Sequence, residues 1–348
     1  MEKKIMKTKT LKKLLAVTCS AILAFSMIGC GSSSEKSSSD VSASKTESEA
    51  DYKIAIVKQL DHASLEEIAN AIAAQLDAIS EEKGIHIEYE IYSGQNDQST
   101  LKQIGEQAIA DGVDAIIPIA TLAAQVMAVC AEDTQTPVVY AAISDPEAAD
   151  MIDIDYVTGT CDALNTGLVL DMMLAQNPDL EKVGLLYSPS ETNSERPIAE
   201  MKSALDDKGI SYTEQTANTN DEVVQAASSL IAEGVDAIFT PTDNVIMAAE
   251  LAIYEDLADA GIPHYTGADS FVRNGAFAAS GVNYTDLGTE TADLAYTVLT
   301  EGMAELFDYY YVDSGIITIN SETAKTLGID CSVFTDIWDI VEVTTTEE

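Results

Sequence analysis

Histidine, cysteine and basic residues are all scarce in this chain. Its 348 residues include only three histidines and five cysteines. These are scattered, without CxxC pairs, metal-site spacing or a disulfide framework. A glycine-rich phosphate loop and a nucleophile elbow are also missing. We therefore expect no bound metal, no cofactor and no catalytic residues, and the chain is not predicted to be an enzyme.

The shortage of basic residues makes the chain strongly acidic. Lys and Arg number 18 against 59 Asp and Glu, which gives a formal net charge of −41. Such a field repels nucleic acid and anionic membrane surfaces, so neither is an expected partner. Solubility explains the charge more simply than a specific role such as cation capture. The length predicts two domains of ordinary size. We expect the protein to be a monomer.

The first 50 residues predict an export signal and a tether. Residues 1–29 combine a lysine-rich start with an apolar stretch too short for a comfortable membrane span, which indicates a signal peptide. Met27-Ile28-Gly29-Cys30 resembles a bacterial lipobox, although Met27 replaces the usual Leu. The alternative is an ordinary Cys beside a secretory segment. We expect lipidation of Cys30, a flexible Ser-rich linker over 30–50, and an extracytoplasmic protein anchored to the cell membrane.

One segment occurs twice. ADGVDAIIPIAT at 110–121 returns as AEGVDAIFTPTD at 232–243, with six of twelve positions identical. In each copy a helix-like stretch stops at Gly, and a short apolar strand then ends in small hydroxylated residues. The repeat period is too long for a solenoid, so the copies predict two similar α/β lobes.

Strand and helix patterns alternate along the rest of the body. This order predicts two doubly wound parallel sheets with both faces covered. The expected strands are 53–57, 85–91, 115–119, 137–142, 183–187, 211–215, 237–240 and 263–266. The expected helices are 64–79, 99–110, 122–132, 194–208, 221–232 and 245–260.

Small polar residues fill the loops that follow these strands, where open parallel sheets bind ligands. Helix capping explains any one of them taken singly, but capping does not require both lobes to present such loops at the same edge. The candidate ligand-binding residues are Gln59, Asp61, His62, Asn96, Thr121, Ser144, Ser188, Ser190, Asn193, Thr240, Thr242, Asp243 and Asp269.

Seven segments carry a more specific resemblance: IVKQLDHASLEEI, GQNDQSTL, DAIIPIATLAAQ, PVVYAAISDP, VGLLYSPSETNS, VDAIFTPTDN and GADSFVRNGAFAASGVNYTDLG. In this order, over 52–329, the chain resembles the ABC-transporter substrate-binding lipoproteins of the family that includes tryptophan- and tyrosine-binding proteins. The resemblance implies a type I periplasmic-binding fold. It also implies solute delivery to a membrane permease driven by a cytoplasmic ATPase.

The resemblance also implies a domain layout. Lobe 1 would comprise 51–160 and 285–308, and lobe 2 would comprise 161–284 and 309–348. A three-segment hinge would cross between the lobes near 158–164, 281–284 and 309–315. A helix over 286–300 would return to lobe 1.

An amino acid, with an aromatic one implied by the relatives, is the expected ligand. Its carboxylate would meet hydroxyls and helix N-termini, with Ser144, Ser188, Ser190 or Thr242 as candidates. Its ammonium would meet Asp269 or, as second choice, Asp243. His62 would either contact the ligand or lie at the surface before the cap Ser64. Tyr92, Tyr140, Tyr187, Phe271 and Tyr284 near strand ends are either core residues or a pocket wall.

Other outcomes stay open at this point. The ligand can instead be a nucleoside, a sugar or a small carboxylic acid. The output can instead be signalling, through a receptor lipoprotein that captures a solute and presents it to a sensor.

Overall fold

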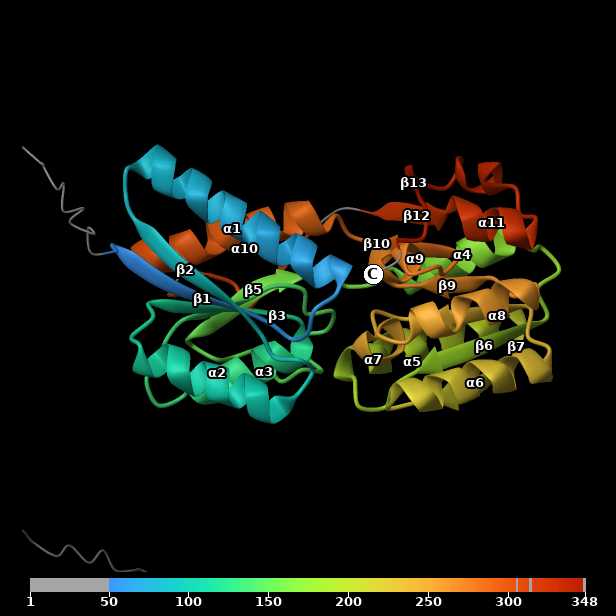
Figure 1. The fold of residues 1–348 in the computed structure, drawn as a ribbon, viewed down its shortest axis with the longest axis horizontal. Helices are drawn as coiled ribbons and strands as arrows, with labels where there is room; N and C mark the ends of the chain where they lie inside the picture. Colours follow the sequence, from blue (N-terminus) through green and yellow to red (C-terminus); the bar gives the residue numbers. More distant parts are fainter. Residues whose placement is uncertain (1–49, 305, 313–314, 347–348) are drawn as a thin grey trace, which may run out of the picture. The chain divides into compact units, whose positions relative to one another are not determined.

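The protein is described from a computed structural model that covers residues 50–304, 306–312 and 315–346 (Figure 1). Ser48–Glu348 forms one compact unit. The predicted signal peptide, Cys30 and all but the last residue of the predicted linker lie outside the described residues. Within the described ranges, no helix has both the length and the apolar character needed to cross a membrane.

The first lobe is built on a six-stranded parallel sheet in the order β11-β5-β4-β3-β1-β2. Its strands are β1 (Tyr52–Lys58), β2 (Ile87–Ser93), β3 (Ala115–Ile119), β4 (Val138–Tyr140), β5 (Val157–Cys161) and β11 (Tyr310–Tyr311). Helices α1 (Ala63–Lys83) and α10 (Tyr284–Glu301) pack together on one face, and α2 (Gln98–Ala110) and α3 (Thr121–Ala131) pack together on the other (Figure 1).

The second lobe is built on a seven-stranded sheet in the order β13-β12-β10-β9-β8-β6-β7. All its neighbours are parallel except β10 and β12. The strands are β6 (Lys182–Tyr187), β7 (Ser211–Thr216), β8 (Ala237–Thr240), β9 (His264–Thr266), β10 (Ala278–Gly281), β12 (Ile316–Asn320) and β13 (Ile340–Val343). The helices are α4 (Thr166–Gln176), α5 (Thr192–Lys208), α6 (Asn220–Glu233), α7 (Asn244–Met247), η1 (Glu250–Ala252), α8 (Tyr254–Asp259), α9 (Asp269–Arg273), α11 (Ser321–Leu327) and η2 (Cys331–Phe334).

The repeated segment occupies the same place in both sheets. It contributes β3 and β8, which are the central strands of the matching orders β5-β4-β3-β1-β2 and β10-β9-β8-β6-β7. The repeated glycines, Gly112 and Gly234, have φ values of 74° and 65° just after α2 and α6. Glycine adopts this left-handed conformation without steric cost, so it ends each helix and turns the chain into the strand. The predicted fold of two doubly wound lobes is confirmed.

The chain passes three times between the sheets, after β5, after β10 and after β11. The first passage begins later than the sequence predicted, because 157–161 completes β5 before the chain leaves the first sheet. A second correction concerns Tyr310–Tyr311, which the sequence placed in lobe 2. These residues pair with Thr160 and Cys161 of β5 and therefore extend the first sheet.

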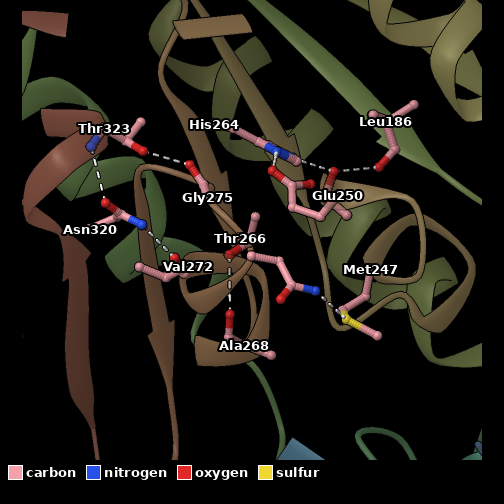
Figure 2. Close-up of polar contacts among 12 residues, drawn as sticks. Leu186, Met247, Glu250, His264, Thr266, Ala268, Val272, Gly275, Asn320 and Thr323 are labelled. Atoms are coloured by element: carbon pink, nitrogen blue, oxygen red, sulfur yellow. Dashed lines mark hydrogen bonds and ion pairs between the residues drawn. The ribbon is translucent and has the colours of Figure 1, made fainter. Parts of the chain in front are cut away.

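The helix expected over 245–260 is broken into α7, η1 and α8. Glu250 lies in the break and is fully buried, with its Oε1 3.0 Å from Nδ1 of His264. Figure 2 shows the Glu250 carboxylate facing the His264 ring, in a network that continues to the backbone of Leu186. The buried contact of Glu250 with His264 of β9 thus falls where the expected helix is interrupted.

Candidate functional site

A small cavity lies between the two lobes, beyond the carboxyl ends of their strands. Its volume is about 30 Å³, enough for one or two water molecules but far below the size of an amino-acid site. A larger ligand therefore requires the lobes to move apart. The cavity is lined by His62, Ser64, Leu65, Ala120, Thr121, Ala142, Ser144, Asp162, Asn193, Thr242, Asp243, Asn244, Met247, Ala268, Ser270, Phe271 and Tyr284.

Four side-chain hydrogen bonds join the lobes directly around this cavity. Ser144 Oγ lies 3.0 Å from Thr242 Oγ1, and Ser64 Oγ donates to Asp269 Oδ1 over 3.0 Å. His62 Nε2 and Asn244 Oδ1 are 3.3 Å apart. Gln59 Nε2 donates to Glu191 Oε1, also over 3.3 Å. Each hydrogen bond pairs a strand-end loop or helix start of one lobe with the corresponding region of the other.

Asp162 supplies a buried carboxyl group to the cavity. It follows β5 directly, is only 7% exposed, and accepts a hydrogen bond from Ser144 Oγ over 2.8 Å. Burial raises the pKa of its carboxyl, while the hydrogen bonds from Ser144 and Tyr284 act in the opposite direction. None of the residues lining the cavity is Lys or Arg. A cationic group entering the cavity would therefore compensate a buried carboxylate that lacks a positive partner there.

His62 contributes a neutral ring. Burial lowers the pKa of its imidazole to about 4. Asn244 Nδ2 donates to Glu191 Oε2 over 2.8 Å, which directs Asn244 Oδ1 toward His62 Nε2. Because Oδ1 can only accept, the His62 proton resides on Nε2 and Nδ1 is left as an acceptor. This Nδ1 is buried and has no hydrogen-bond partner within the described chain.

Ser270 and Thr121 add hydroxyl groups to the wall. Ser270 is 1% exposed, and its Oγ is buried without a hydrogen-bond partner among the described residues. Thr121 begins α3, directly after Ala120, whose φ of 76° and ψ of 163° belong to a region that side-chain-bearing residues rarely occupy. Ala142, after β4, also has a positive φ of 59°. Backbone strain of this kind concentrates at binding sites.

Asp243 lines the cavity, but its oxygens are occupied by its own lobe. Oδ1 accepts hydrogen bonds from the amides of Val245 and Ile246, and Oδ2 accepts from Ser188 N and Ser194 Oγ, at 2.7 to 3.0 Å. Asp243 is thus the N-cap of α7 and a clamp on the loop after β6. Burial of the Glu191 side chain, and then the charge of the neighbouring Asp243, raise the pKa of Glu191 to about 7.

The rest of the wall is apolar. Leu65, Met247, Phe271 and the ring of Tyr284 belong to one buried hydrophobic cluster that reaches the cavity. Of the other aromatic candidates, Tyr140 is fully buried in the core of the first lobe. The hydroxyl groups of Tyr92 and Tyr187 donate hydrogen bonds to Glu90 and Glu214.

The structure brings six of the thirteen candidate residues to the cavity and places seven elsewhere. The six are His62, Thr121, Ser144, Asn193, Thr242 and Asp243. The seven that do not line it are Gln59, Asp61, Asn96, Ser188, Ser190, Thr240 and Asp269.

Those seven side chains have other partners. Asp61 is exposed and paired with Lys58, and Asp269 Oδ2 accepts from Arg273 Nε over 2.8 Å. Gln59 is a buried scaffold residue that bonds Asn96 Oδ1 and the amide of Leu122. Ser188 and Ser190 bond each other. Thr240 donates to Leu186 O inside its lobe.

Four polar residues of the cavity were not predicted as ligand contacts: Ser64, Asp162, Asn244 and Ser270. Each follows a strand end within a few residues, so the strand-end rule reaches them once the strands are known. Asp162 was missed because β5 was not recognised as a strand. The sequence predicts helix capping for Ser64, yet its hydroxyl bonds Asp269 of the other lobe. Among the described residues, no group of acidic, His and Cys side chains is arranged to hold a metal ion.

Two parallel-sheet lobes that face each other across a polar cavity define a bilobed binding protein of the periplasmic type. The chain belongs to the ABC transporter substrate binding protein family, which it matches over residues 53–333. It is 27% identical over 321 residues to the tyrosine-binding protein of Clostridioides difficile (strain R20291), covering 91% of this chain and 92% of that protein.

Two solved structures are also similar. One is an ABC domain in complex with L-Trp from Streptococcus pneumonia, with 27% identity, a TM-score of 0.76, and coverage of 83% of this chain and 99% of that one. The other is the ligand-free, open structure of a substrate binding protein with adhesive properties from Clostridium difficile. It has 26% identity, a TM-score of 0.65, and coverage of 85% and 100%.

Proposed function

We propose that this chain is the extracytoplasmic solute-binding component of an ABC importer and that it captures an L-amino acid, with an aromatic side chain, between its lobes. The observation that carries the proposal is Asp162, a buried carboxylate at a cavity whose lining contains no Lys or Arg. An α-ammonium group would neutralise the charge of this carboxylate and donate hydrogen bonds to it. A sugar or nucleoside would leave it uncompensated, and an anionic ligand would be repelled.

The ligand carboxylate would be held by hydroxyl groups rather than by a cation. Ser270 Oγ has no other partner in the described chain, and Thr121 and Thr242 present their hydroxyls to the same cavity. The apolar wall of Leu65, Met247 and Phe271 suits the side chain of the ligand. The complex of a related ABC domain with L-Trp and the relation to a tyrosine-binding protein support this ligand class.

Capture would couple ligand binding to lobe closure. A ligand that contacts both lobes stabilises the closed arrangement only by its differential affinity for closed over open. On this proposal, cavity groups that now bond each other across the lobes, such as Ser144 and Thr242, would exchange one another for ligand atoms. In the proposed cycle, the closed protein presents the amino acid to a permease driven by a cytoplasmic ATPase, while lipidated Cys30 keeps it at the outer face of the membrane.

A binding screen tests the ligand class. The full-length chain would be heated with L-amino acids, nucleosides and sugars, and hits would be measured by calorimetry. Saturation at 100 times the dissociation constant adds about 2.7 kcal/mol of stability. We expect shifts with L-Trp or L-Tyr and none with N-acetyl-L-tryptophan, a matched control without the ammonium charge. Shifts with sugars alone would contradict the proposal.

The importer role needs a separate measurement. Adding the loaded protein to its reconstituted permease and ATPase should raise ATP hydrolysis, whereas the unloaded protein should raise it less. Equal hydrolysis with and without the loaded protein would point to a receptor role instead.

A further inference from the structure

His62 lines the cavity and has a free acceptor on its ring. Nδ1 is buried, lacks a hydrogen-bond partner in the described chain, and carries no proton because Nε2 donates to Asn244 Oδ1. Leu65, three residues further along, lines the same cavity. Met247 lies one helical turn after Asn244 on α7 and also lines it. An unpartnered acceptor thus belongs to a cavity whose wall also includes apolar side chains that suit the non-polar part of a ligand.

The hydrogen bonds of Asp162 and those of His62 share no residue, although Ser144 also bonds Thr242 and Ser64 bonds Asp269 around the same cavity. Asp162 is bonded to Ser144 and Tyr284. His62 is bonded to Asn244, which is bonded in turn to Glu191. The ligand ammonium is drawn to the carboxylate of Asp162, because a charge-assisted hydrogen bond is stronger than one to a neutral imidazole. The His62 acceptor then remains for another part of the ligand.

We propose that His62 Nδ1 accepts a hydrogen bond from the ligand side chain and thereby selects aromatic amino acids that carry a ring donor, a phenol O–H or an indole N–H, over those that do not. This inference rests on the proposed capture of an amino acid. A site built around a buried acceptor rejects a ligand without the donor, since binding it leaves the acceptor unsatisfied. A neutral buried acceptor predicts a preference of about 10-fold or more.

Two substitutions separate the roles of the two ring nitrogens. His62→Gln places an amide near the Nε2 position, so that the bond to Asn244 is kept and the acceptor at Nδ1 is lost. His62→Asn places its side-chain oxygen near the Nδ1 position, so that the acceptor is kept and the bond to Asn244 is lost. A structural role of His62 through its bond to Asn244 would give the reverse pattern, with His62→Gln unaffected and both ligands weakened by His62→Asn.

Calorimetry on the full-length chain would compare L-tyrosine with L-phenylalanine, and L-tryptophan with 1-methyl-L-tryptophan. We expect the wild type to prefer the donor-bearing member of at least one pair by about 10-fold or more. His62→Gln should reduce that preference to under about 3-fold, chiefly by weakening the donor-bearing ligand, and His62→Asn should retain it.

Three outcomes would overturn the inference: no preference in the wild type, equal weakening of both ligands by His62→Gln, or no binding of aromatic amino acids. Amino-acid capture is tested independently through Asp162. If Asp162→Asn weakens every amino acid while the wild type shows no donor preference, capture stands and the role of His62 falls.

Discussion

Ser144 Oγ, in the loop after β4, lies 3.0 Å from Thr242 Oγ1, in the loop after β8, so two hydroxyls from opposite lobes bond each other across the cavity. Ser144 Oγ also donates to Asp162 Oδ1, which makes Thr242 the donor in the bond between the lobes. One short chain of hydrogen bonds thus runs from the buried carboxylate of the first lobe to the second lobe. A ligand ammonium that binds Asp162 would therefore join a series of hydrogen bonds that connects the two lobes.

Thr242→Val should shift the ligand-free protein toward separated lobes. The substitution keeps the shape of the side chain and removes the donor, and one such bond contributes about 1 kcal/mol, or roughly a 5-fold change in the ratio of closed to open protein. Small-angle scattering should show a larger mean radius of gyration. Thr289→Val is the matched control, because Thr289 Oγ1 bonds only Thr285 O within α10. An unchanged radius for Thr242→Val would show that this bond does not hold the lobes together.

Asp162→Asn should weaken amino-acid binding much more than Asp269→Asn. Leaving a bound ammonium without its carboxylate in a buried site costs about 3 kcal/mol or more, which corresponds to a loss of affinity of roughly 100-fold. Asp269 already pairs with Arg273 and does not line the cavity, so its amide variant should lose less than about 10-fold. Calorimetry on both variants measures this, with melting temperatures as the control for folding. A larger loss for Asp269→Asn would restore the first choice made from the sequence.

The same two aspartates show how far sequence reasoning reaches. Alternating patterns and the repeat at 110–121 and 232–243 predict both lobes. Strands that are buried on both faces of a parallel sheet have continuous apolar sequences, and amphipathic helices separate them. The strand β5 reads VTGTC and has no such run. The sequence therefore predicts a crossover there, and the strand-end rule does not point to Asp162. Its burial comes from tertiary contacts with β4 and α10, which local pattern does not encode.

Side-chain direction is the second limit. The strand-end rule identifies the correct edge of each sheet, yet Thr240 bonds inward to Leu186 O while Thr242, two residues later, faces the other lobe. The loop conformation decides between the two. Asp269 is predicted as a ligand contact because it follows a strand. In the structure it forms an ion pair with Arg273, four residues later on α9, and so is not a free carboxylate.

Asp243→Ala should destabilise the second lobe. Four hydrogen bonds end on this carboxylate, three of them from backbone amides that would be left buried without a partner. We expect a loss of about 3 kcal/mol or more in the free energy of unfolding, measured with urea. Asp221→Ala is a suitable control, because it lies exposed in the first turn of α6. A loss below about 1 kcal/mol would show that the loop rearranges to satisfy these amides.

Glu191→Gln should change how stability depends on pH. Burial, then the charge of Asp243, raises the pKa of Glu191 to about 7 from its ordinary value of 4.5. The folded protein therefore holds this proton over a range in which the unfolded chain has lost it. The resulting stability is fully present below pH 4.5 and is lost as the pH rises through about 7, at no more than about 1.4 kcal/mol per pH unit.

His62 acts in the opposite direction over an overlapping range, so the wild-type profile alone does not isolate Glu191. The pKa of His62 falls to about 4 from 6.5, which gives stability above pH 6.5 that is lost as the pH falls through 4. The contribution of His62 to the free energy of unfolding cancels when Glu191→Gln is compared with the wild type, because both proteins keep His62. Glutamine mimics the protonated carboxyl, so between pH 5 and pH 8 the variant should gain on the wild type by up to about 3 kcal/mol in urea unfolding. A difference that stays constant across this range would mean that Glu191 is ionised throughout and that the Gln59 and Asn244 amides compensate its burial.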